Sequence, residues 1–139
     1  MRAGGRLTLL SVLAAVAGQP ARADIIDKVT TTVNPTTYEG PCPALIALEG
    51  VVSFDVVSNV QEKYTYRWES GNQALTDDET AFSKGRRNHV LAMWEVQEAV
   101  GKTVTMPIVL HAWRYVAANY DKTTADRYSI PVNLIVTCR

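Results

Sequence analysis

Cysteine and histidine are scarce in this 139-residue chain, which contains two of each. Two lone thiols make a poor metal site, and neither His89 nor His111 stands in a spacing typical of a metal centre or a catalytic triad. The formal charge is zero, and the only basic cluster is Lys84, Arg86 and Arg87. A nucleic-acid partner, a metal site and cofactors are therefore not expected.

Long uncharged apolar runs are missing after the N-terminus. The chain begins with a charged start, an apolar stretch over residues 7–17 and the small-residue site Ala21-Arg22-Ala23, which are the three parts of a secretory signal. The stretch is too short to cross a bilayer, which requires about twenty residues. We expect a signal peptide at 1–23 and an exported mature chain, 24–139, that is periplasmic or extracellular and has no membrane span.

The mature chain has the size of one ordinary domain and is mildly acidic, because the three leader arginines leave eleven basic against fourteen acidic residues. Cysteines in an exported chain usually pair, since the periplasm and the extracellular space are oxidising. We therefore predict a Cys42–Cys138 disulfide between the start of the folded body and its end. Such a bond also removes the thiol as a nucleophile.

Alternation of apolar and polar residues recurs along the mature chain, with turn residues about every ten positions, and it predicts an all-β domain. A first strand is expected over 25–33, closed by Asn34-Pro35. From Cys42 to Val56 every second residue is apolar or small, and a third run places three rings on one face: Tyr64, Tyr66 and Trp68. The last run, 128–138, alternates throughout and places Tyr128, Ile130 and Cys138 on its apolar side.

Three segments are less regular. Residues 75–85 carry capping-box spacing between Thr76 and Glu79, which allows at most a short helical turn. Residues 90–100 combine helix-favouring residues with strand alternation, and we favour a strand. Residues 103–116 have two apolar faces, one of them aliphatic.

About seven strands in a hundred residues, with a tryptophan on the third, predict an immunoglobulin-like β-sandwich. The cysteines are not in the antibody arrangement, in which the bond joins two central strands. Here Cys42 precedes or starts the second strand and Cys138 ends the last, so the bond would tie one end of the sandwich.

A set of landmarks strengthens this reading: Pro35, Tyr38, Gly40, Cys42 and Pro43, then Tyr66-Arg67-Trp68, Trp94 and the closing strand to Cys138. The chain resembles small exported bacterial immunoglobulin-like domains of uncharacterised function over most of residues 30–139. The resemblance implies a bacterial source and a sandwich fold. It carries no catalytic or ligand-binding residues with it.

The strongest functional candidate is the row His111, Trp113 and Tyr115, which alternation places opposite the aliphatic face. If that face is open, these side chains form a candidate binding face for a protein or a glycan, because tryptophan and tyrosine are enriched at binding hot spots. The alternative is burial beneath a long loop such as 117–126. For Tyr64, Tyr66 and Trp68 core packing is the favoured interpretation.

Two charged clusters are weaker candidates. Asp77, Asp78 and Glu79 supply oxygen ligands suited to calcium but lack the geometry of a dedicated loop, so a solvated turn is favoured. The basic cluster of Lys84, Arg86 and Arg87 around Gly85 suits an anionic partner or, more simply, a solvated tight turn. No nucleophile elbow is present, and an enzyme is not expected.

We therefore expect an exported binding module of unknown ligand. One alternative is a structural subunit of a surface assembly, in which residues 24–33 serve as a detachable strand. The other is an inhibitor of a secreted enzyme that acts through an end loop.

Overall fold

The computed structural model describes residues 26–55, 63–114 and 126–139, and these residues form strands, turns and loops without a helix. The all-β prediction is confirmed, and no described segment could cross a membrane as a helix. The strands in order are β1 (Ile26–Asn34), β2 (Thr37–Gly40), β3 (Ala44–Phe54), β4 (Lys63–Ser70), β5 (Gln73–Ala74), β6 (Glu79–Phe82), β7 (Arg87–Val96), β8 (Thr103–Arg114), β9 (Arg127–Tyr128) and β10 (Val132–Cys138).

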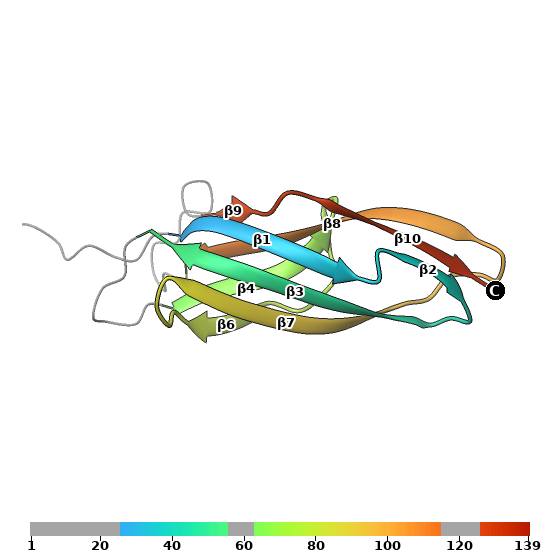
Figure 1. Cartoon of the computed structure of the whole chain (residues 1–139), viewed down its shortest axis with the longest axis horizontal. Coiled ribbons are helices and arrows are strands. Elements are labelled where there is room, and N and C mark those ends of the chain that lie inside the picture. The colour runs from blue at the N-terminus through green and yellow to red at the C-terminus, as the bar shows by residue number, and fades with distance from the viewer. Residues whose placement is uncertain (1–25, 56–62, 115–125) are drawn as a thin grey trace, which may run out of the picture.

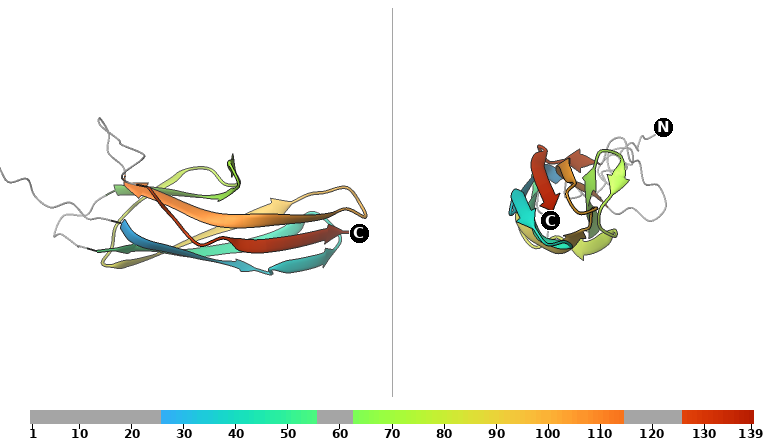
Figure 2. Two further views of the ribbon diagram at one scale, coloured as in Figure 1. Left: turned by 90° about the horizontal axis from the view of Figure 1, so that it is seen from above. Right: turned by 90° about the vertical axis from the view of Figure 1, so that its right-hand side faces the viewer.

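The strands form two sheets that face each other as a β-sandwich (Figures 1 and 2). The first sheet has three strands in the order β1-β3-β7, all antiparallel. The second has seven, in the order β2-β10-β8-β4-β5, with β6 also on β4 and β9 also on β8. The two sheets therefore differ in width.

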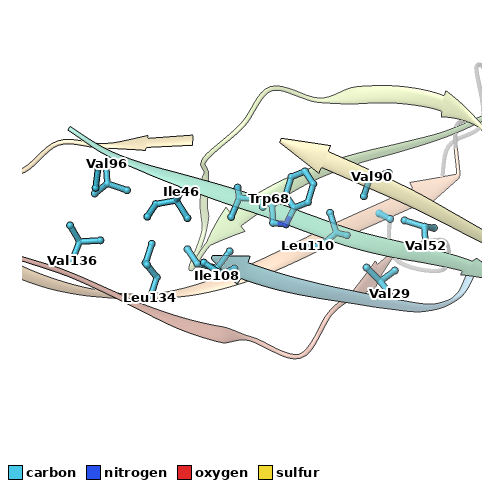
Figure 3. Packing of buried hydrophobic residues seen from close by; sticks show 14 of the residues in the cluster. Val29, Ile46, Val52, Trp68, Val90, Val96, Ile108, Leu110, Leu134 and Val136 are labelled. Atoms are coloured by element: carbon cyan, nitrogen blue, oxygen red, sulfur yellow. The ribbon is translucent and has the colours of Figure 1, made fainter. Parts of the chain in front are cut away.

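The core lies between the sheets and follows the alternation of the sequence (Figure 3). In β3 the even-numbered residues Ala44 to Phe54 are buried, as predicted. Facing them from the second sheet are Trp68, Ile108, Leu110, Leu134 and Val136, all buried. A side chain at Gly50 would meet Leu110 at 2.3 Å and the carbonyl of Thr30 at 3.0 Å, so a glycine permits the close approach of β3 to β8.

One polar contact crosses the core. The indole Nε1 of Trp68 donates to Thr31 Oγ1 at 2.9 Å, and that hydroxyl donates to the carbonyl of Glu49 at 2.7 Å. A buried indole needs such a partner, because an unpaired donor costs about 1 to 3 kcal/mol. Tyr64 and Trp68 are buried and Tyr66 partly so, which confirms the predicted core packing of these rings.

The Cys42–Cys138 disulfide is present and joins residues 96 positions apart. Cys42 lies in the loop before β3 and Cys138 ends β10, so the bond links the two sheets at one end, where Figure 1 marks the C-terminus. On the chain-entropy model a loop of this length stabilises the fold by roughly 4 to 5 kcal/mol.

Residues 75–85, where the sequence allows at most a short helical turn, form no helix. Strand β6 lies there along β4, after β5, and the amide of Leu75 donates to the carbonyl of Trp68 at 2.8 Å. One sequence expectation is wrong: residues 128–138 do not form one continuous strand. Tyr128 and Ile130 are exposed because the hydroxyl of Ser129 accepts from the amide of Leu110 and breaks the alternation.

Other expected strands are present. The first strand runs from Ile26 to Asn34, and of the strand favoured at 90–100, residues 90–96 belong to β7 and residues 97–100 are not in a strand. The short strand β2 was not expected; it pairs in parallel with β10. Of the predicted strand 103–116, residues 115 and 116 lie outside the described residues.

Candidate functional site

Of the predicted face of His111, Trp113 and Tyr115, the structure describes the first two residues, and both lie on the side of β8 opposite its buried aliphatic face. Ile108, Leu110 and Ala112 of β8 are fully buried between the sheets, which leaves His111 and Trp113 on the outer side of the second sheet. Strand β8 pairs with β4 on one side and with β9 on the other, so His111 lies between Arg67 and Tyr128, while Trp113 lies opposite Thr65 of β4. Tyr115 lies outside the described residues.

His111 is the centre of a buried polar cluster. Its Nδ1 lies 2.7 Å from Glu69 Oε1 and its Nε2 lies 2.8 Å from Asp126 Oδ2. Although on the outer face, His111 is 0% exposed. Carboxylates accept hydrogen bonds, so the imidazole ring lies between two acceptors, one at each nitrogen.

Two rings and an arginine enclose this cluster. The ring of Tyr128 stacks on His111 with centroids 4.2 Å apart, and Trp113 lies 4.5 Å from it on a tilted plane. Arg67 donates from Nε to Glu69 Oε1 at 2.7 Å, forms an ion pair with Asp78 at 3.2 Å, and lies over the Trp113 ring. Every charge named here has an opposite partner.

The electrostatics of the cluster favour the ionised form of Glu69 and the neutral form of Tyr128. Burial alone would raise the pKa of the Glu69 carboxyl, but hydrogen bonds from Arg67 and His111, together with their charges, lower it overall. The pKa of the Tyr128 phenol is raised by burial and by the nearby carboxylates of Asp126 and Glu69, against the opposing effect of Arg67. Tyr128 therefore keeps its proton.

This arrangement limits what His111 can do. Both ring nitrogens already lie within hydrogen-bond distance of a carboxylate, so neither is open to a substrate. The ring is also too buried to touch a partner, so the burial alternative holds for this residue. The outward parts of the face are Tyr128, which is 55% exposed, and the half-buried Trp113.

A second candidate lies on the open flank of the sandwich, where the first sheet ends. A groove of about 710 Å³ separates β7 from the β5–β6 segment of the second sheet. Its lining residues are Tyr66, Trp68, Leu75, Thr76, Asp77, Glu79, Leu91, Ala92, Met93, Trp94 and Glu95. The sequence reasoning missed this groove.

The strand that borders the groove is unpaired on one side. Among the described residues β7 pairs only with β3, and Figure 1 shows it at the margin of its sheet. Leu91 is 68% exposed and Met93 60%, although both belong to a regular strand. Monomeric proteins usually protect such edges with charges, prolines or covering segments.

The flank is charged with opposite signs at its two ends. Three carboxylates and no basic side chain line the large groove: Asp77, Glu79 and Glu95. Farther along β7 a smaller hollow of about 260 Å³ is lined in part by Lys84, Arg87 and His89. Arg87 and Glu95 form no ion pair within the described part of the chain.

The remaining predicted clusters are accounted for by local structure. Gly85 has a φ of 75°, and the Asn88 side chain accepts from the amide of Lys84 and donates to the carbonyl of Gly85, which builds the expected tight turn with exposed basic residues. Asp78, one of the three acids considered for calcium, instead forms the ion pair with Arg67. Across the described ranges, no three His, Cys, Asp or Glu side chains are grouped to hold a metal ion.

The sequence signals for both regions were indirect. Glu69 and Asp126 lie 42 and 15 positions from His111, so only strand pairing brings them together. The groove had a faint signal, since residues 90–96 carry apolar side chains in both phases of the strand. Compared with known proteins, the chain matches no family model and no curated protein.

Proposed function

We propose that this protein is an exported, immunoglobulin-like recognition module that binds a macromolecular partner along the β7 flank and has no catalytic activity. The supporting observation is the exposed pair Leu91 and Met93 on an unpaired strand edge beside a large groove. Burying apolar surface yields about 25 cal/mol per Å², so covering these side chains is favourable. Contiguous exposed apolar surface of this kind typically marks an interaction site.

The export part of the proposal rests on two features. The N-terminal residues have the composition of a secretory signal, and the disulfide is of the kind that persists in oxidising compartments. The binding part is consistent with the fold, since β-sandwiches commonly bind ligands at a sheet edge or at their end loops.

The chemistry of the described residues supports binding rather than catalysis. Both cysteines are in the disulfide, and both nitrogens of His111 are engaged by carboxylates. The structural-subunit alternative is less well supported. Residues 26–33 of the arm belong to β1, which pairs with β3 and buries Ile26, Val29 and Val33, so its release would open the core.

The test is a comparison of variants of the exported, disulfide-bonded protein on peptide and glycan arrays. We expect saturable binding to one class of ligand, and we expect Met93→Arg to abolish it by placing a cation on the apolar edge. The matched control is Ile130→Arg, because Ile130 is 84% exposed but lies away from this flank. Absence of saturable binding to both arrays, or equal binding by Met93→Arg, would overturn the proposal.

A further inference from the structure

We infer that the partner is an extended polypeptide segment that adds to β7 as a fourth strand of the first sheet. This inference rests on the proposed function and specifies its ligand. The first sheet stops at β7, whereas the second continues past β4 to β5 and β6. Within the described residues, no strand of the first sheet lies opposite the β5–β6 segment. We call this uncovered segment the floor.

The backbone of β7 is oriented to receive such a strand. The amide of Phe54 donates to the carbonyl of Arg86 at 2.8 Å, and the β3–β7 register continues from there without a bulge. In an antiparallel ladder, residues direct both backbone groups alternately to one neighbour and to the other. The amides and carbonyls of Leu91, Met93 and Glu95 therefore face away from β3, toward the open flank.

The groove suits the side chains of an added strand. Side chains alternate across a strand, so every second residue of the segment would point between the sheets. The groove receives them against Tyr66, Trp94 and Leu75, which are only partly buried. The remaining side chains would lie beside Leu91 and Met93 on the outer face. Apolar residues are thus expected at both the inward-pointing and the outward-pointing positions at the centre of the segment.

The charges of the flank set the orientation of the segment. Glu95, Asp77 and Glu79 mark one end, and Arg87 and Lys84 mark the other. Antiparallel addition, the more stable of the two pairings, brings the segment's N-terminal half to the Glu95 end. The segment is therefore expected to carry lysine or arginine toward its N-terminus and aspartate or glutamate toward its C-terminus.

Two other occupants fit less well. A glycan has no repeating amides and carbonyls to match those of β7. A second copy pairing through its own β7 would bring its own β5–β6 floor along, and the two floors would meet in the layer beneath the joined edges. A polypeptide segment that carries no second sheet avoids this conflict and still satisfies the edge.

The first experiment measures binding of synthetic eight-residue peptides to the intact protein by fluorescence anisotropy. The parent peptide is extended and apolar at its centre, with lysine near the N-terminus and glutamate near the C-terminus. Exchanging its lysine and glutamate should weaken binding about tenfold, or 1.4 kcal/mol. Methylation of the amides that face β7 should abolish binding, whereas methylation of the alternate amides should leave Kd within a factor of about three.

The second experiment changes the protein. In the variant Lys84→Glu/Arg87→Glu/Asp77→Lys/Glu79→Lys/Glu95→Lys all five flank charges are exchanged, so the preference should reverse and the exchanged peptide should bind better. Asp27→Lys, an exposed charge change on β1, should leave the preference unaltered. A reversal of preference is a result that a folding defect does not produce.

The outcomes separate this inference from the proposed function. If glycans bind and Met93→Arg abolishes that binding, recognition at the flank stands and the peptide inference is wrong. If peptides bind, but their Kd depends neither on the charge exchange nor on which set of alternate amides is methylated, strand addition is likewise wrong. Concentration-dependent dimerisation that Met93→Arg abolishes would identify a second copy as the occupant. If no peptide or glycan binds, both proposals fail.

Discussion

The outer face around His111 and the flank beside β7 differ from an ordinary protein surface in opposite ways: the first buries charged groups, and the second exposes apolar ones. Around His111, charged groups are buried outside the main core, and each has a partner: Glu69 and Asp126 on the ring, Arg67 on Glu69. Beside β7, apolar side chains are exposed and backbone groups on one edge are unpaired by other strands of the described chain. The charges of the first region are paired within the described chain, whereas the edge of the second is open within it, and we propose that a partner covers that edge.

This difference separates a structural role from a binding role. Buried ion pairs are costly to desolvate, and removing one member leaves an uncompensated charge. Exposed apolar side chains contribute little to the stability of the free protein. Substitutions at His111 should therefore affect folding, and substitutions at β7 should affect recognition.

The largest effect is expected for His111→Ala. Loss of the ring leaves the buried carboxylates of Glu69 and Asp126 without the hydrogen-bond partner between them, which should lower the free energy of unfolding by about 3 to 5 kcal/mol. Urea denaturation followed by tryptophan fluorescence measures it. The triple variant Glu69→Leu/His111→Leu/Asp126→Leu removes all three polar side chains and should recover much of the loss. A change below about 1 kcal/mol in His111→Ala would show that the cluster is not structural.

A smaller effect is expected from acid. Because the pKa of Glu69 is lower in the folded protein than the ordinary value of 4.5, the folded state favours the ionised carboxylate. Its contribution is complete at pH above 4.5 and is lost as the pH falls through the folded-state pKa. The free energy of unfolding should therefore decline in the parent as the pH falls below about 4.5, and less steeply in Glu69→Gln. Parallel curves for the two proteins would contradict the assignment.

Much of the fold could be predicted from the sequence, because alternation directly encodes which face of a strand is buried. The buried face of β3 follows this alternation from Ala44 to Phe54, and the aliphatic face of β8 follows it from Ile108 to Ala112. The disulfide was predictable from the signal-like N-terminus and the number of cysteines. Alternation failed after Tyr128, where a side-chain hydrogen bond from Leu110 to Ser129 interrupts the ladder.

The candidate sites were less predictable, for two physical reasons. The partners of His111 come from β4 and from the residue before β9, so their proximity depends on strand pairing that local patterns do not specify. The groove depends on which strand ends each sheet. Apolar residues in both phases of β7 indicate either a strand buried on both sides or an exposed edge, and strand order decides between them.

The smallest effect on stability is expected for Leu91→Thr, which sharpens the contrast with His111. Leu91 is 68% exposed, and threonine suits a strand, so the free energy of unfolding should change by no more than about 0.5 kcal/mol. Binding of the peptide probe should nevertheless weaken, because its outer side chains lose their main apolar neighbour. If Leu91→Thr instead destabilised the protein by about 2 kcal/mol or more, the side chain would be part of the fold, and the division between a completed face and an open flank would fail at the residue on which it most depends.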